Sequence, residues 1–212
     1  MEYFINFSGG VDSTYYLWRW LKENPNKKIF VHHCLLFKNR REVEKIATDN
    51  ILRYFRDNGL SNFEYTETEF SKKGIKATLY DIEPIYFLAG LILKSKSYNS
   101  IQHILFPVCF EEVHGTRLAH LRSGRPWSQF KDKNTRTYKI MLYCNTVAGR
   151  TFEYHSPYYT KTKKQMIQEM PRELFEMTWY CRAKKTKPVD NKPCNNCFNC
   201  NRVQGALKEI DK

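Results

Sequence analysis

The chain has 212 residues, 42% of them hydrophobic and 27% charged, which is the composition of a globular protein with one sizeable core. No apolar run approaches the roughly 20 residues of a membrane span, so we expect no membrane association. The formal net charge of +13 suits an anionic ligand, either a nucleotide or a nucleic acid. The first residues enter a strand pattern without a signal peptide, which favours a cytoplasmic location.

Strands and helices alternate along the first half of the chain. The apolar pattern predicts strands at residues 2–7, 28–37, 62–70 and 100–108, and helices at 12–22, 41–57 and 81–96. This order is typical of a Rossmann-like α/β fold, in which a parallel sheet has helices on both faces. Ligands of such folds bind at the carboxyl edge of the sheet, so we expect the site there.

The second half of the chain is less regular. Residues 138–144 fit either a strand or a helix, 151–154 fit a strand, and 161–170, 172–178 and 203–210 fit helices. Residues 111–139 are polar and basic without periodicity, and we interpret them as an inserted, mobile loop with a role in function. We therefore expect a nucleotide-binding domain at residues 1–180 and a cysteine-rich segment with a C-terminal helix at 181–212.

A glycine turn separates the first predicted strand from the first helix. Its two glycines allow a phosphate to approach the backbone, and the helix start offers free N–H groups to it. The aspartate of the turn would cap the helix or hold Mg²⁺ on the phosphates. By itself, a double glycine fits an ordinary strand-to-helix turn equally well, and no lysine follows it as in a Walker loop. The candidate phosphate-binding residues are Ser8, Gly9, Gly10, Val11, Asp12, Ser13 and Thr14.

Four of the seven cysteines gather near the C-terminus, namely Cys181, Cys194, Cys197 and Cys200. Their spacing suits one tetrahedral Zn²⁺ with four thiolate ligands, and a full ligand set favours a structural role. A redox Cys-x-x-Cys pair is the alternative, but the βαβ setting of a thioredoxin site is lacking. We expect the other cysteines, Cys34, Cys109 and Cys144, to be small buried hydrophobes.

The whole string Ser-Gly-Gly-Val-Asp-Ser-Thr resembles the pyrophosphate-binding motif of the N-type ATP pyrophosphatases. Members of that superfamily split ATP between its α- and β-phosphates and adenylate a carbonyl or amide-like oxygen. The resemblance implies that the turn grips the departing pyrophosphate.

Together, the turn and the cysteine quartet resemble one family of that superfamily, the 7-cyano-7-deazaguanine synthases. Weaker similarity lies in residues 38–44, in residues 106–111, and in Ser156-Pro157 with Lys163 six residues on. The resemblance implies a ligase that uses ATP and ammonia to convert 7-carboxy-7-deazaguanine to an amide and then a nitrile. Lys163 and Arg40 would contact phosphate or developing negative charge, with an ordinary surface arginine as the alternative for Arg40. Glu111 would lie in the substrate pocket.

Two segments depart from the family pattern. Residues 112–122 carry His114 and His120, each a ligand, a base or a solvated side chain, and residues 81–85 keep only a proline of a family motif. An alternative is therefore a related enzyme that modifies a nucleic acid or a protein-linked group, which the basic residues 117–139 would suit. A non-catalytic, zinc-containing nucleic-acid-binding protein is the other alternative. We expect ATP, Mg²⁺ and Zn²⁺ as cofactors, and a homodimer is left open.

Overall fold

The computed structural model describes residues 1–36, 40–71, 81–109, 136–182 and 192–211. Glu111, His114 and His120 lie outside these residues, as does most of the predicted loop. The last four residues of that loop, 136–139, are helical, so the prediction was wrong for them. No helix in the described parts of the chain combines the length and apolarity that crossing a membrane requires.

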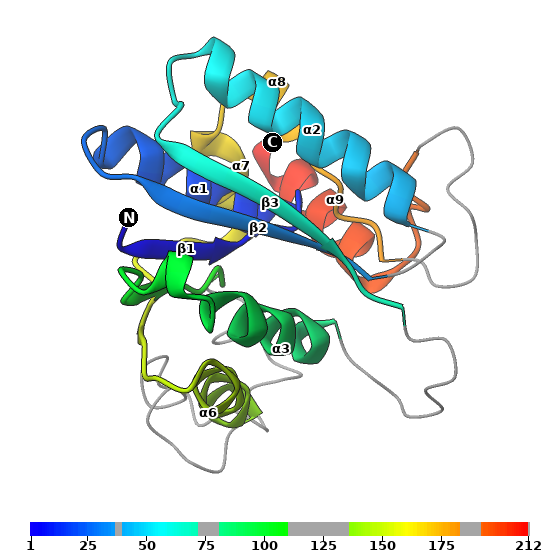
Figure 1. Cartoon of the computed structure of the whole chain (residues 1–212). Helices are drawn as coiled ribbons and strands as arrows, with labels where there is room; N and C mark the ends of the chain where they lie inside the picture. Colours follow the sequence, from blue (N-terminus) through cyan, green and yellow to red (C-terminus); the bar gives the residue numbers. More distant parts are fainter. Residues whose placement is uncertain (37–39, 72–80, 110–135, 183–191, 212) are drawn as a thin grey trace.

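Five parallel strands form one sheet in the order β3-β2-β1-β4-β5 (Figure 1). This sheet confirms the predicted Rossmann-like α/β class. The strand predicted at 100–108 is shorter at both ends than expected, and at its C-terminal end Pro107 has no N–H to continue the ladder. The strands are β1 (Tyr3–Asn6), β2 (Ile29–Leu35), β3 (Phe63–Glu69), β4 (His103–Leu105) and β5 (Glu153–His155).

The helices follow the predicted order. Residues 138–144, which the sequence left undecided, lie within α6, and the last helix begins five residues earlier than predicted, so that it includes Cys200. The helices are α1 (Val11–Glu23), α2 (Arg41–Asp57), α3 (Ile82–Leu93), the 3₁₀ turn η1 (Lys96–Tyr98), α6 (Arg136–Ala148), α7 (Lys163–Glu169), α8 (Arg172–Glu176) and α9 (Phe198–Ile210).

Each face of the sheet has its own core, because neighbouring residues of a strand point to opposite sides. Ile5 and Val31 pack with residues of α1, α2, α7 and α9. Phe4 and Phe30 pack with residues of α3 and α6 on the other face (Figure 1). The predicted covering of both faces by helices is therefore confirmed.

The three cysteines outside the quartet are buried, as predicted. Cys109 and Cys144 are fully inaccessible, and Cys34 is 9% exposed. Burial raises the pKa of the Cys34 thiol to about 12 and that of Cys144 to about 11. Both side chains are consequently neutral, as a small core hydrophobe should be.

Candidate nucleotide-binding site

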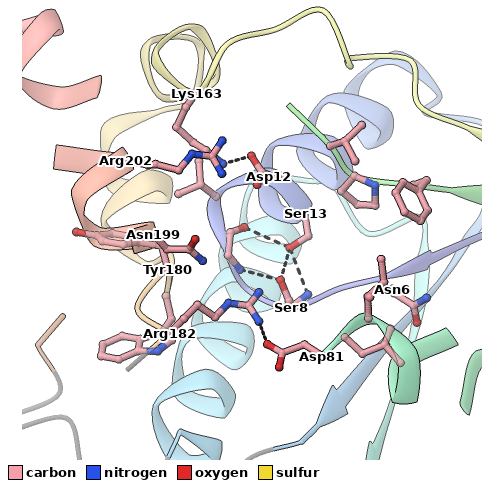
Figure 2. Close-up of a pocket in the computed structure, with 18 of the residues that line it drawn as sticks. Asn6, Ser8, Asp12, Ser13, Asp81, Lys163, Tyr180, Arg182, Asn199 and Arg202 are labelled. Carbon is pink, nitrogen blue, oxygen red and sulfur yellow. Dashed lines mark hydrogen bonds and ion pairs between the residues drawn. The ribbon is translucent and has the colours of Figure 1, made fainter. Parts of the chain in front are cut away.

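A cavity of about 280 Å³ lies beyond the carboxyl ends of β1 and β4 (Figure 2). The chain leaves β1 towards α1 on one face, whereas α3, which precedes β4, covers the other face. The cavity thus occupies the switch point at which α/β proteins bind ligands. Its lining includes Asn6, Ser8, Gly10, Val11, Asp12 and Ser13 from the first turn, Asp81, Ile82, Ile85 and Tyr86 at α3, Phe106, Pro107 and Val108 after β4, and Lys163, Trp179, Tyr180, Arg182, Asn199, Arg202 and Val203.

The glycine turn forms the floor of this cavity. Gly9 has φ +66°, a left-handed conformation, and a Cβ atom there would lie 3.0 Å from Oγ1 of Thr48. The Ser13 hydroxyl accepts a hydrogen bond from the Ser8 amide at 3.2 Å, and so closes the turn. Among the described residues, none accepts a hydrogen bond from the N–H groups of Val11, Asp12 and Ser13. These amides make the helix start a ready site for an anion.

Asp12 does not cap α1, so that interpretation was wrong. The N-cap residue is Gly10, and Asp12 sits in the first turn, where its carboxylate forms an ion pair with Lys163 at the start of α7 (Figure 2). The Thr162 side chain caps α7 and the Gln165 side chain bonds back to Thr162, which fixes the backbone at Lys163. The structure therefore brings two of the predicted site residues together at the cavity, although they are 151 positions apart.

Arg40 is not a surface residue, because it is only 4% exposed. It lies at the N-cap position of α2, with Nη2 at 3.3 Å from Asp81 Oδ2 and Nε at 3.5 Å from Glu44 Oε1. Asp81 also pairs with Arg182, and both of these residues line the cavity. Arg40 is not one of the described lining residues, so it stands behind Asp81. A contact between Arg40 and phosphate stays a prediction.

Several lining residues were missed by the sequence interpretation. Arg182 follows Cys181 directly, and Arg202 comes two residues after Cys200. Both arginines are carried by the segments that also carry the cysteines, and that proximity was the available signal. The opposite wall is apolar and comes from Ile82, Ile85 and Tyr86 of α3 together with Phe106, Pro107 and Val108.

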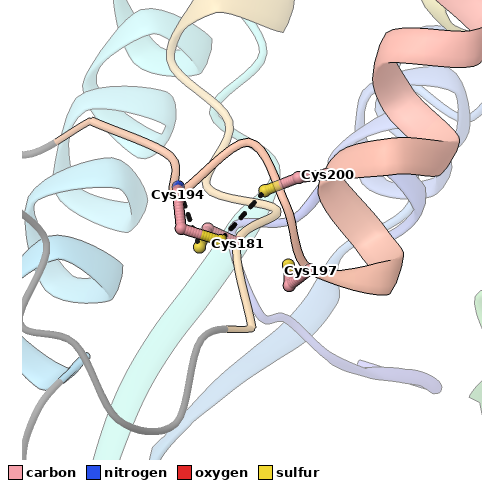
Figure 3. Close-up of side chains that lie close together, drawn as sticks. All are labelled: Cys181, Cys194, Cys197 and Cys200. Atoms are coloured by element: carbon pink, nitrogen blue, oxygen red, sulfur yellow. Dashed lines mark hydrogen bonds between the residues drawn. The ribbon is translucent and has the colours of Figure 1, made fainter.

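The four C-terminal cysteines converge on one point, with their Sγ atoms all within 4.8 Å of one another (Figure 3). The distance between the sulfurs of Cys194 and Cys200 is 3.9 Å. Thiolates at about 2.3 Å from a tetrahedral Zn²⁺ lie about 3.8 Å apart, so the donor set fits a single ion. A [4Fe-4S] cubane carries each thiolate on a different iron, which requires wider spacing of the sulfurs.

Backbone N–H groups donate to two sulfurs of this cluster, although burial raises the pKa of its Cys200 thiol. The Arg182 amide donates to the sulfur of Cys197 and the Cys194 amide to that of Cys181, both at 3.4 Å. Burial alone would raise the pKa of Cys197, but such hydrogen bonds outweigh burial and hold it below its usual value. Cys181 lies in the irregular segment after α8, which stops at Glu176.

Comparisons with known proteins identify the fold. No protein-family model matches the chain, and no curated protein matches it. Among solved structures, the U34-tRNA thiolase NcsA from Methanococcus maripaludis, with its [4Fe-4S] cluster, is similar to this protein. The TM-score is 0.51, the sequence identity is 11%, and the match covers 100% of this chain and 73% of that chain. At this identity, the likeness supports the Rossmann-like fold and nothing finer.

Proposed function

We propose that this protein is an ATP-dependent enzyme that adenylates an acyl oxygen and releases AMP and pyrophosphate. The observation that carries the proposal is the floor of the cavity, where unbonded amides of α1 lie beside the buried ammonium group of Lys163. Backbone donors at a helix start, combined with a cation, are suited to the negative charge of a leaving pyrophosphate.

The charges around the cavity favour an anionic ligand. Lys163, Arg182 and Arg202 line it, against the carboxylates of Asp12 and Asp81, so the cations exceed the anions by one. The carboxylate of Asp12, next to the turn, would supply one ligand to a Mg²⁺ ion bound to the phosphates. The residues present thus fit both the phosphates and their metal ion. Lys163 would then neutralise charge as pyrophosphate departs.

For the acceptor, we propose a carboxylate on a planar, purine-like ring, of which 7-carboxy-7-deazaguanine is the first candidate. The apolar wall formed by α3 and the residues after β4 suits a flat ring, and Arg182 offers a guanidinium group for a carboxylate. The carboxylate oxygen would attack the α-phosphorus and expel pyrophosphate. Ammonia would next attack the acyl carbon and expel AMP, which leaves an amide. A second adenylation, at the amide oxygen, would permit loss of AMP and formation of the nitrile.

For the cysteine cluster, we propose a structural Zn²⁺. Four thiolates fill a tetrahedron and leave no coordination position for a substrate. The similar tRNA thiolase carries a [4Fe-4S] cluster, which is the alternative occupant. Metal analysis of protein purified without oxygen distinguishes the two, since a cluster contributes iron, inorganic sulfide and visible absorption.

The proposed reaction is tested with purified protein, ATP, Mg²⁺, ammonium and 7-carboxy-7-deazaguanine. We expect AMP and pyrophosphate in equal amounts, and a product mass that corresponds to the amide or nitrile. Omission of the carboxylate is the control for simple ATP hydrolysis. ATP that stays intact with this and other purine-like carboxylates, although the folded protein binds nucleotide, would refute the acceptor class. Failure to bind ATP at all would refute the adenylation proposal itself.

A second candidate is the modification of a nucleic-acid base through the same adenylation step. The net charge of +13 favours a polyanionic partner, and a solved structure with a similar fold is a U34-tRNA thiolase. We would expect tRNA to bind with an affinity that falls steeply with salt, and to change in mass when ATP is present. If tRNA does not bind at low salt, this candidate is excluded.

A further inference from the structure

A second group of potential metal ligands lies on the two last strands of the sheet, apart from the cysteine cluster. His103 opens β4, and Glu153 and His155 are the two ends of β5. In the parallel register of these strands, His103 pairs with Glu153 and Leu105 with His155. None of the three residues lines the cavity described above.

Three donor atoms converge at this place. Nδ1 of His103 lies 3.0 Å from Nε2 of His155 and 3.2 Å from Oε2 of Glu153. The same Oε2 atom lies 3.5 Å from Nε2 of His155. The three distances therefore form one closed triangle of two imidazole nitrogens and one carboxylate oxygen.

This triangle has the dimensions of one face of a tetrahedral metal coordination polyhedron. Ligands at about 2.0–2.1 Å from a tetrahedral Zn²⁺ lie about 3.3 Å from one another. Hydrogen bonding alone satisfies the triangle poorly, because a carboxylate only accepts and one N–H cannot point well at two acceptors. A cation would bind all three lone pairs at once.

The surroundings orient one of the histidines and leave the group open to solvent. The ring of Tyr3 stacks on His103 with centroids 4.8 Å apart, which restrains the orientation of that imidazole. The side chain of His103 is 21% exposed and that of Glu153 is 71% exposed, so an ion can enter from solvent.

We propose that His103, Glu153 and His155 bind a divalent transition-metal ion such as Zn²⁺, with water completing its coordination. Two imidazoles and one carboxylate suit ions of this class rather than Ca²⁺ or Mg²⁺. Because only three side chains contribute, this site binds more weakly than the four-cysteine cluster. The ion links β4 to the edge strand β5 and stabilises their pairing.

The test uses untagged full-length protein that first receives one equivalent of Zn²⁺, and is then titrated with Co²⁺. The thiolates take the first ion, and thiolate-bound Co²⁺ is recognised by intense near-ultraviolet absorption. We expect one further equivalent of Co²⁺ to bind with weak visible bands and without thiolate absorption. A titration that shows no further equivalent would overturn the proposal.

Variants locate the bound ion. We expect His155→Ala, and separately Glu153→Gln, to lower the affinity for this Co²⁺ at least tenfold, while circular dichroism and the first equivalent of Zn²⁺ stay unchanged. Glu64→Gln changes an exposed carboxylate on β3, away from these three residues, and serves as the matched control for Glu153→Gln. Glu153→Gln alters an exposed side chain, so it remains a test if a histidine variant folds poorly. Co²⁺ binding that persists in the folded Glu153→Gln protein at unchanged affinity would contradict the assignment.

Discussion

The backbone N–H of Trp179 donates a hydrogen bond to the carbonyl oxygen of Gly9, with an N···O distance of 2.8 Å. This bond attaches the segment that leads into Cys181 to the phosphate turn. Tyr180 and Arg182, on either side of Cys181, line the cavity, as does Arg202 on the helix that carries Cys200. The cysteine cluster and the candidate nucleotide site therefore share one wall.

Loss of the cluster metal should weaken nucleotide binding as well as lower stability. In Cys197→Ser, the cluster loses a thiolate, and the segments that carry Arg182 and Arg202 lose their common anchor. We expect a lower metal content, a lower Tm and an ATP affinity reduced at least tenfold, measured by calorimetry at a temperature where the variant is folded. Cys34→Ser, outside the cluster, is the control for the chemical change. Unchanged ATP affinity in metal-free, folded protein would disprove the coupling.

Gly9 can be tested against Gly59, because both have positive φ angles, of +66° and +73°. Substitution by alanine costs about 1 kcal/mol at either position, since a Cβ atom is strained in this conformation. At Gly59 nothing lies within 4 Å of the added Cβ, whereas at Gly9 it meets Thr48. We expect both variants to be destabilised, Gly9→Ala more strongly, and only Gly9→Ala to lose ATP affinity. Equal effects in urea unfolding and calorimetry would show that crowding at the turn is unimportant.

Much of the fold follows from local sequence patterns. Apolar residues at helical spacing gave the limits of α2 as the structure has them, because its buried residues form one continuous stripe. The short strand β4 was overestimated, since the apolar residues after it serve as cavity wall rather than as strand. The undecided segment at 138–144 is helical because it packs on α3, which local pattern does not reveal.

Part of the candidate site can likewise be predicted from local sequence, and part of it depends on tertiary packing. The glycine turn and the cysteine quartet are contiguous or closely spaced motifs, so their chemistry can be read along the chain. The pairs Asp12–Lys163 and Asp81–Arg182 join residues 151 and 101 positions apart, and only the packing of α7 and the C-terminal segment brings them together. The sequence predicted both Asp12 and Lys163 as site residues, but not that they contact each other. It predicted no site role for Asp81 or Arg182.

The Asp12–Lys163 pair predicts an effect on stability in addition to activity. Lys163 is 6% exposed, so Asp12→Asn deprives a buried ammonium group of its carboxylate partner. We expect a loss of about 3 kcal/mol in the free energy of unfolding, together with loss of AMP formation. Adding Lys163→Met should restore part of the stability, because the buried ammonium group is then gone, but none of the activity.

Glu176→Gln is the control for this prediction, because it removes the carboxylate partner of Arg172 on an exposed helix face. That surface pair should contribute little. The comparison needs urea unfolding for stability and an AMP assay for activity. If Asp12→Asn and Glu176→Gln unfold alike, the ion pair at the cavity has no structural importance.

Two adjacent histidines on β2 predict how stability depends on pH. His32 and His33 are each 1% exposed, and burial lowers the pKa of both from 6.5 to about 4. Nδ1 of His32 lies 2.9 Å from the hydroxyl of Thr66, and Nδ1 of His33 lies 2.8 Å from that of Thr48. The folded protein therefore holds both rings neutral where the unfolded chain already binds protons.

The contribution of the two neutral histidines to the free energy of unfolding should consequently be complete above pH 6.5, and should be lost as the pH drops towards 4. Between those limits each histidine contributes a slope of about 1.4 kcal/mol per pH unit. Urea unfolding at several pH values measures this slope. Asparagine does not titrate, so His32→Asn should reduce the slope by the contribution of one histidine. A simple packing defect would instead lower the free energy of unfolding equally at every pH. Acid also releases metal from thiolates, but that loss is common to variant and wild type, so the difference between their slopes isolates the histidine.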